Sequence, residues 1–513
     1  MVISVEINKK IEKIIIYAVE IIFIFILSFL TIESMFRSCS ITSSETTTYL
    51  FDNPIIHIIT ISITIFIFSK INKIKKDIDK KIVIGLVCIW GLISAIWIFM
   101  SNLYPRADQR YIYNITLQMK KGIFDSFEIG KYMVANPHQL GLLLYEYIFS
   151  FIFGVENYLG LQLINVVALF ITYFSIYKLT TYMFKDKKTS ICTLIGLFLF
   201  IPMWFYITFI YGNIIGLMFS MISLVFILKY LEKNKIVYLI TASICIGLAI
   251  MFKSNYLIML IAIVCIIILD MISNKKINNI GIIIALILGY LVMKILVPII
   301  AFEITGKEKV KGIPMLAYVE MGIQEGTRAP GWYNGYNRKV YANNKYDYEK
   351  TTIQVKKDIK ESISNFKNNP KYTVEFFYKK VVSQWNNPTF QCFWIGRGIK
   401  DAEKKVKPAI VRAINGNGKT NKILFEYTNI IQTIILFGAT ICILINFKKI
   451  NGKQLVFAVM FIGGFLFHIV WEAKCQYTIS YFILLIPYSI RGYLQLSKKI
   501  QEFLNNKYKK LIK

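Results

Sequence analysis

The sequence predicts an all-α polytopic membrane protein, and three observations carry this prediction. Of the 513 residues, 56% are hydrophobic, and the mean hydropathy is +0.53. Apolar runs of the length that a spanning helix needs, about 20 residues, recur along the chain. Lysines gather in the short segments between these runs. Because a bilayer offers the backbone no hydrogen-bond partners, such runs are expected to be helical.

The apolar runs predict a bundle of about 12 transmembrane helices. The first run has spanning length and lacks a small-residue cleavage site, so we expect it to stay as an anchor. The candidate spans are residues 13–33, 54–70, 82–101, 161–183, 190–210, 213–230, 236–252, 255–271, 279–301, 425–446, 455–472 and 479–494.

The net charge of +30 predicts the topology rather than a nucleic-acid partner. Short loops rich in lysine and arginine mark the cytoplasmic side of a membrane. With the spans above, the lysine-rich segments and the basic N-terminus all fall on one side: Lys9, Lys10 and Lys13, then residues 70–81, 185–188, 448–453 and 498–513. We therefore expect a multi-pass protein of the cell membrane with both termini in the cytoplasm. Its surplus charge also suits contact with anionic lipid.

The apolar segment 139–154 needs a separate decision. It is short, contains Glu146 and ends at Gly154. Counting it as a span would put the lysines at 185–188 outside and invert the later loops against the charge rule. We therefore expect a helix that lies at the outer interface or dips partway into the membrane.

These boundaries divide the chain into four parts. Residues 1–81 hold two N-terminal transmembrane helices, and 82–301 form a transmembrane core with the large outer loop 102–160. Residues 302–424 form a small extracytoplasmic domain with helices expected at 349–366 and 371–385. Residues 425–513 supply the last transmembrane helices and a basic cytoplasmic tail.

Cysteine and histidine usage predicts neither a disulfide framework nor a metal site. The eight cysteines are scattered without a CxxC spacing, and the chain has three histidines. Metal-binding and disulfide-rich sequences show closer, regular spacings. We expect no metal and no cofactor.

Asp108 is the first candidate for chemistry. It lies in Tyr104-Pro105-Arg106-Ala107-Asp108-Gln109-Arg110, directly after the span 82–101. A carboxylate at a membrane boundary, flanked by two arginines, fits a reaction site at the outer surface. The alternative is an interfacial aspartate that simply pairs with a neighbouring arginine.

The segment that begins at Asp108 resembles the first outer loop of GT-C glycosyltransferases. In the protein mannosyltransferase and aminoarabinose-transferase branches, an acidic residue after a span is followed by an amphipathic stretch and a His-Pro-Pro turn. Here the turn is Asn136-Pro137-His138-Gln139, and an aromatic helix then ends at Phe153-Gly154. Gln109 stands where the family has the second acid of an Asp-Glu pair. Further similarities to Gram-positive members lie at Met321-Gly322, Gly331 to Asn334, Lys379 to Pro388, and Glu472 with Tyr477, so the resemblance covers residues 82–494.

This resemblance implies sugar transfer from a polyprenyl-phosphate-linked donor to a hydroxyl outside the cytoplasm, with inversion. Asp108 would be the general base that takes the proton of the attacking hydroxyl. The acceptor would be a cell-wall glycan, a teichoic acid or a protein. The bias towards lysine, isoleucine and asparagine is typical of an AT-rich bacterial genome, which favours undecaprenyl phosphate as the lipid carrier.

A departing phosphodiester needs cationic groups to stabilise its charge. The candidates are Arg110, Lys253 and Arg328. Lys253 lies in a short turn between two spans, where a lysine either meets an anion or extends to the headgroups. Candidates for contact with sugar or acceptor are His138, Glu320, Trp332, Tyr333, Trp385 and Glu472. The aromatic ones among these are equally consistent with core packing.

Three other functions fit parts of the sequence. A flippase or transporter of a polyprenyl-linked glycan would place polar residues through its spans, whereas 190–210 and 279–301 hold almost none. An O-antigen-polymerase-like enzyme would have arginine-rich outer loops, whereas 302–424 is dominated by lysine. In a non-catalytic scaffold that displays residues 302–424, Asp108 would be replaceable.

Overall fold

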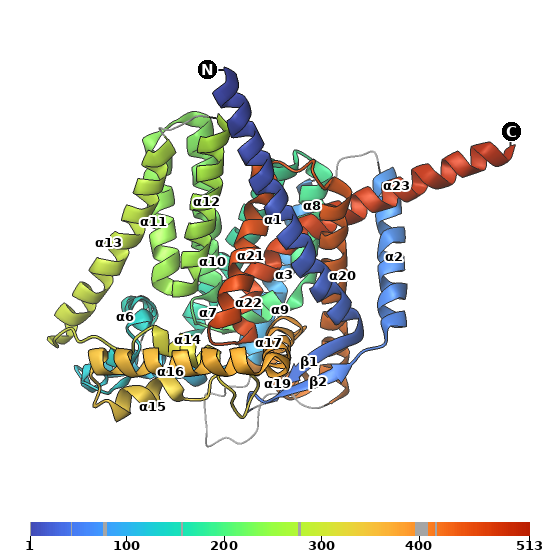
Figure 1. The fold of residues 1–513 in the computed structure, drawn as a ribbon. Helices are drawn as coiled ribbons and strands as arrows, with labels where there is room; N and C mark the ends of the chain where they lie inside the picture. The colour runs from blue at the N-terminus through green and yellow to red at the C-terminus, as the bar shows by residue number, and fades with distance from the viewer. Residues whose placement is uncertain are drawn as a thin grey trace.

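A computed structural model describes residues 2–42, 44–74, 80–154, 157–274, 279–395, 409–415 and 418–512. Part of the lysine-rich loop 70–81 and part of the segment 302–424 therefore lie outside the described residues. The regular structure of these described residues is helical apart from one small hairpin, as Figure 1 shows. The prediction of an all-α polytopic membrane protein is confirmed.

Nine helices within these described ranges are long and apolar enough to cross a membrane. They are α1 (Val2–Phe36), α2 (Pro54–Lys73), α3 (Lys80–Ser101), α7 (Tyr158–Phe184), α10 (Asn213–Lys233), α12 (Leu257–Asn274), α13 (Ile280–Thr305), α20 (Lys419–Asn446) and α21 (Val456–Val470). A tenth span is formed if α8 (Lys187–Leu199) joins α9 (Ile201–Phe205) and η3 (Tyr206–Thr208) across a bend of 57°.

Two of the expected spans have a different form. Residues 236–252 make α11 (Ile236–Phe252), an apolar helix of 17 residues. Residues 479–494 are shared by α22 (Cys475–Phe482), η7 (Ile483–Leu485) and the start of α23 (Ile486–Ile512). Hydropathy alone does not register the division of residues 479–494, because the residues on both sides of each boundary are apolar.

The loop 102–160 is a chain of short helices at the lower end of the bundle in Figure 1. These are α4 (Ala107–Lys120), η1 (Asp125–Phe127), α5 (Tyr132–Ala135), η2 (Pro137–Gln139) and α6 (Leu140–Phe153). The 14 residues of α6 are too few for a spanning helix of about 20 residues. Its first half is buried, whereas Ile148, Phe151 and Ile152 are exposed. The N-terminal half of α6 is therefore packed inside the protein, and its exposed apolar side chains lie in the C-terminal half.

The segment 302–424 adds further short helices and one long amphipathic helix at the same end. They are α14 (Leu316–Gly322), α15 (Tyr336–Asn343), α16 (Tyr348–Asn368), α17 (Pro370–Trp385), α18 (Cys392–Ile395) and α19 (Ala409–Asn415). The helices expected at 349–366 and 371–385 are confirmed as α16 and α17. Asp347 caps α16, since its side chain accepts a hydrogen bond from the Lys350 amide.

The N-terminal helices α1 and α2 are joined by the one hairpin, which the sequence analysis did not foresee. Its strands are β1 (Arg37–Ile41) and β2 (Thr47–Phe51), paired antiparallel. Helix α1 packs against α20, and its buried Phe23, Leu27 and Leu30 belong to the main hydrophobic core. In Figure 1 the hairpin lies at the end of the bundle that carries α14 to α17, whereas both termini lie towards the other end.

Candidate functional site

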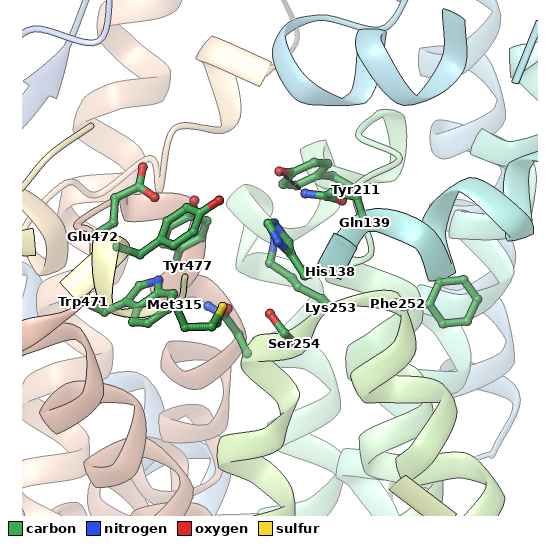
Figure 2. Close-up of a pocket in the computed structure, with 12 residues that line it drawn as sticks. His138, Gln139, Tyr211, Phe252, Lys253, Ser254, Met315, Trp471, Glu472 and Tyr477 are labelled. Carbon is green, nitrogen blue, oxygen red and sulfur yellow. Dashed lines mark hydrogen bonds between the residues drawn. The ribbon is translucent and has the colours of Figure 1, made fainter. Parts of the chain in front are cut away.

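A cavity opens where the loop 102–160 meets the turns between the long helices. Its wall comes from η2, the Tyr211 turn before α10, the Lys253 turn after α11, the start of α14 and the segment between α21 and α22. Figure 2 shows Glu472 and Tyr477 on one side and His138, Gln139 and Tyr211 on the other. The lining residues are His138, Gln139, Tyr211, Phe252, Lys253, Ser254, Asn255, Met315, Tyr318, Trp471, Glu472 and Tyr477.

Asp108 lies beside this cavity, in the first turn of α4. The Tyr211 hydroxyl donates to its Oδ2 at 3.2 Å, and Gln139 Nε2 lies 2.7 Å from the same hydroxyl. Tyr132 also hydrogen-bonds the carboxylate. Because the N-terminal end of a helix favours negative charge, the position of Asp108 suits a carboxylate. Asp108 is half-buried, so its oxygens remain reachable.

Lys253 lies on the floor of the cavity, where α11 ends and η4 (Ser254–Tyr256) begins. Its Nζ donates to Asn213 Oδ1 at 3.2 Å, and the ammonium lies 4.4 Å from the ring centre of Tyr211. Burial lowers the pKa of Lys253 to about 7, and the nearby Lys474 acts in the same direction. Asp108 and Glu472 oppose this shift. Tyr211 therefore touches the candidate base through its hydroxyl and the candidate cation through its ring face.

Glu472 stands on the opposite wall, in the segment between α21 and α22, and Lys474 follows two residues later. Both are buried, at 6% and 8% exposure. Burial raises the pKa of Glu472 to about 7 against the lowering effect of Lys474. Burial would lower the pKa of Lys474, but the carboxylates of Glu45, Glu472 and Asp108 outweigh it and the net pKa is raised.

His138 lines the cavity, and its ring meets the ring of Tyr318 edge-on at 6.0 Å between centroids. Burial lowers the pKa of His138 to about 4, with Lys253 acting the same way against Asp108. The imidazole is therefore neutral at neutral pH, with one nitrogen that donates and one that accepts hydrogen bonds. A neutral histidine suits contact with sugar hydroxyls.

The other two cationic candidates, Arg110 and Arg328, do not line the cavity. Arg110 is exposed on α4, two residues beyond Asp108. Arg328 forms an ion pair with Glu45 and covers the ring of Tyr333 at 5.3 Å. Tyr333 itself is half-buried. The two residues form a contact of their own beside Glu45.

Three other candidates are held away from the cavity, and a stacking or acceptor role does not fit their surroundings. Trp332 is 1% exposed and donates to Ser383 Oγ at 2.9 Å. Trp385, also 1% exposed, packs on Phe461 and Phe465 in the main core. Glu320 accepts hydrogen bonds from Gln324 and Ser362 on the far side of α14.

The glycines near Trp332 allow close packing of the backbone. A Cβ on Gly331, which has φ +73°, would lie 2.5 Å from the carbonyl oxygen of Gly322. The Ala473 amide donates to the Gly331 carbonyl at 2.8 Å. These glycines allow the loop to pack on the chain's own backbone next to Glu472.

Sequence reasoning missed several residues at the site. Tyr211 joins the Asp108 network, Tyr318 lines the cavity, and Glu45 pairs with Lys474 from the hairpin. The Tyr211-Gly212-Asn213 turn carried a signal, since polar residues at a break between apolar runs are costly unless they are used. No sequence signal marked Glu45, because its ion-pair partners Lys474 and Arg328 are distant in the chain. Within the described ranges, no group of three or more His, Cys, Asp or Glu side chains is arranged to hold a metal ion.

Comparisons with known proteins bear on this arrangement. Residues 143–300, from α6 to α13, match the model of the family described as dolichyl-phosphate-mannose-protein mannosyltransferase. No curated protein matches the chain significantly. Among solved structures, the archaeal oligosaccharyltransferase AglB from Archaeoglobus fulgidus, in complex with an inhibitory peptide and a dolichol-phosphate, is similar at 13% identity and a TM-score of 0.39. That match covers 83% of this chain, and this chain spans about half of AglB, 51%.

The matched residues hold the Tyr211 turn and the Lys253 turn, and they begin within the loop 102–160 that carries Asp108. This similarity covers about a third of the chain, and it agrees with the resemblance to the protein mannosyltransferase branch of GT-C glycosyltransferases that loop 102–160 carries.

Proposed function

We propose that the protein transfers a sugar from a polyprenyl-phosphate-linked donor to an acceptor hydroxyl, with inversion and with Asp108 as general base. The observation that carries the proposal is the position of Asp108 and Lys253 on either side of Tyr211. The hydroxyl of Tyr211 donates to the aspartate at 3.2 Å, and its ring lies 4.4 Å from the lysine ammonium. A base and a phosphate-binding cation are the two groups that this reaction needs.

In the proposed reaction, the acceptor oxygen attacks the anomeric carbon while Asp108 takes its proton. The bond between the anomeric carbon and the phosphate oxygen breaks, and polyprenyl phosphate leaves with the electron pair. Attack opposite to the leaving group inverts the configuration at the anomeric carbon. The leaving phosphate needs little protonation, so a second carboxyl group is not required as an acid.

Lys253 is the cation proposed to bind the departing phosphate. It is half-buried at the cavity floor, and its ammonium has donors beyond the one bound to Asn213. Arg328 and the exposed Arg110 are proposed as further cations that the phosphate meets as it enters. Arginine suits this task because its planar group donates to two phosphate oxygens at once.

His138, Tyr333 and Glu472 are proposed to contact the sugar or the acceptor. His138 and Glu472 face each other across the cavity in Figure 2, and both present groups that can donate or accept hydrogen bonds. The acceptor class proposed is a cell-wall glycan, a teichoic acid or a protein hydroxyl. The cavity end of the bundle is proposed to face the extracytoplasmic side, since the lysine-rich segments 185–188 and 448–453 and both ends of the described chain lie towards the other end.

The test is sugar transfer in membranes that carry the full-length protein, with a panel of radiolabelled undecaprenyl-phosphate-linked hexoses. Asp108→Asn should reduce transfer by about 100- to 10,000-fold, the usual contribution of a general base. Asp125→Asn is the matched control, because Asp125 is exposed in the same loop and distant from the cavity lining. It should transfer sugar like wild type.

Two outcomes would contradict the proposal. Equal transfer by wild type and Asp108→Asn, at matched expression, would remove Asp108 from the chemistry. Translocation of lipid-linked sugar by wild type without any transfer, for every donor in the panel, would favour the flippase instead.

A further inference from the structure

The hairpin between α1 and α2 places a buried carboxylate behind the cavity wall, two residues of sequence from Glu472 through its partner Lys474. Glu45 is 5% exposed and lies in the hairpin turn with φ +63°, a conformation that is unfavourable for residues other than glycine. Its Oε1 pairs with Lys474 Nζ at 3.0 Å, and its Oε2 pairs with Arg328. One carboxylate thus bridges two cations that belong to different segments.

The hairpin is fastened where it lies, so this contact is a fixed feature of the fold. The Cys39 amide donates to the Asn386 carbonyl at 3.0 Å, and Asn387 Nδ2 donates to the Cys39 carbonyl at 2.6 Å. The Gln391 amide group lies 3.4 Å from Glu45 Oε1. A strained turn that persists in a well-anchored loop often marks a residue held for its function.

We propose that Glu45 is a positioning residue, the internal counterion that holds Lys474 and Arg328 behind the cavity wall that carries Glu472, so that their positive charge acts on the donor phosphate. The proposal rests on the proposed function, and it gives the N-terminal helices a part in the reaction site. Glu45 itself touches no reacting atom. It acts through the two cations, which a buried carboxylate keeps charged and oriented.

The charge of Lys474 is the property that Glu45 most directly controls. Burial disfavours the charged ammonium, as it does for the neighbouring Lys253, whose pKa is lowered to about 7. At Lys474 the adjacent carboxylates reverse this effect, and Glu45 is the largest of them. The charged groups that face Lys474 or its aromatic neighbour Trp394 are Glu45, Arg328, Glu472, Asp108, Lys253 and Arg106.

Removal of the Glu45 charge should therefore appear as a pH-dependent loss of phosphate binding. In Glu45→Gln, burial dominates and the pKa of Lys474 falls. Below that pKa both proteins carry the Lys474 cation, and above it only wild type does. The ratio of dissociation constants, variant over wild type, should rise about tenfold between pH 6.5 and pH 9, the size of one charge-assisted contact.

The experiment measures binding of undecaprenyl phosphate to full-length protein in lipid nanodiscs across this pH range. Glu45→Asp, which keeps a carboxylate, should recover most of the wild-type profile. Glu20→Gln is the matched control, because Glu20 is fully buried in the same N-terminal segment but accepts its hydrogen bond from the Lys448 amide at the opposite end. In a Lys474→Met background, the Glu45→Gln substitution should add no further pH dependence.

The possible failures are distinct. If wild type binds no undecaprenyl phosphate at any pH, both the proposed function and this inference fall. If wild type binds it and the ratio for Glu45→Gln stays constant with pH, the inference alone is overturned. If Glu45→Gln does not accumulate in membranes, the binding profiles of Glu45→Asp and Lys474→Met decide whether the inference holds. A pH-independent loss in Lys474→Met with a wild-type profile in Glu45→Asp supports the inference, and wild-type binding by Lys474→Met overturns it.

Discussion

At the scale of single residues, burial decides which charges the cavity holds at neutral pH. Lys253 and Glu472 both have pKa values shifted to about 7, in opposite directions from their ordinary values. Each group loses solvent, and each is only partly compensated by its neighbours. Perturbed groups in a cleft are typical of reaction sites. The charge of this cavity should therefore change within the physiological range of pH.

Lys253 gives a prediction with a definite sign. A lysine with a lowered pKa is charged below about 7 and loses its charge as pH rises through that value. If Lys253 binds the donor phosphodiester, kcat/KM for the donor should fall as pH rises from 6.5 to 8.5. Lys253→Arg should flatten this fall, since arginine stays protonated throughout. Lys253→Met should raise the KM for the donor by about 10- to 100-fold at pH 6.5.

Rate measurements on wild type and both variants across this range check the prediction. Lys294→Met is a suitable control, since Lys294 lies on α13 and is not among the lining residues. If kcat/KM of Lys253→Arg fell with rising pH as in wild type, the pH dependence would belong to Glu472 or another group. Lys253 would then have no part in phosphate binding.

At the scale of elements, the loop 321–335 and the segment 471–477 support each other at the cavity wall. The backbone bridge between Trp332 and Ala473 joins them, and the buried Lys380 donates to the Trp471 carbonyl at 2.8 Å. Burial lowers the pKa of Lys380 to about 7, which is consistent with partners that are mainly backbone carbonyls. The contact holds Glu472 and Lys474 against the site.

Gly331 tests this support. An alanine there would place its Cβ 2.5 Å from the Gly322 carbonyl oxygen and 2.7 Å from Lys380 Cδ. Gly335 has a similar φ of +82° but open space around its Cβ, so Gly335→Ala measures the backbone cost alone, about 1–2 kcal/mol. Gly331→Ala should lower the temperature of half-inactivation in detergent clearly more than Gly335→Ala. Equal effects of the two substitutions would mean that the contact with Gly322 is not a structural constraint.

The elements themselves were largely predictable, because spans and amphipathic helices follow from local patterns. The length of α6 and the positions of α16 and α17 agree with the sequence. The site was predictable only where a motif marked it, as at Asp108 and His138. Tyr211 bonds to Asp108 across 103 positions of sequence, and no local pattern encodes such a contact. The roles of Trp332 and Trp385 were ambiguous for the same reason. The local sequence does not distinguish an aromatic residue that packs in a core from one that stacks on a sugar.

At the scale of the whole molecule, the bundle separates two kinds of surface. The hairpin, the loop 102–160 and α14 to α17 gather at the end that holds the cavity, and the two termini lie towards the other end (Figure 1). The distribution of lysines predicts that this other end faces the cytoplasm. A lipid-linked donor would then meet the site from the outer leaflet.

Cysteine labelling in intact cells checks this orientation. Thr42 is exposed in the hairpin, and Lys449 is exposed at the opposite end after α20. A membrane-impermeant maleimide should label Thr42→Cys in intact cells and Lys449→Cys only after permeabilisation, relative to the background from the native cysteines. Labelling of Lys449→Cys alone in intact cells would invert the topology and place the cavity inside.

The most direct test of the central claim measures donor binding and turnover separately in purified Asp108→Asn protein. Asparagine keeps the shape of the side chain and removes only the base, so the dissociation constant of the donor should remain close to that of wild type. The single-turnover rate of sugar transfer should fall by about 100- to 10,000-fold. A rate equal to that of wild type, or a loss that lies entirely in donor binding, would contradict the assignment of Asp108 as the base.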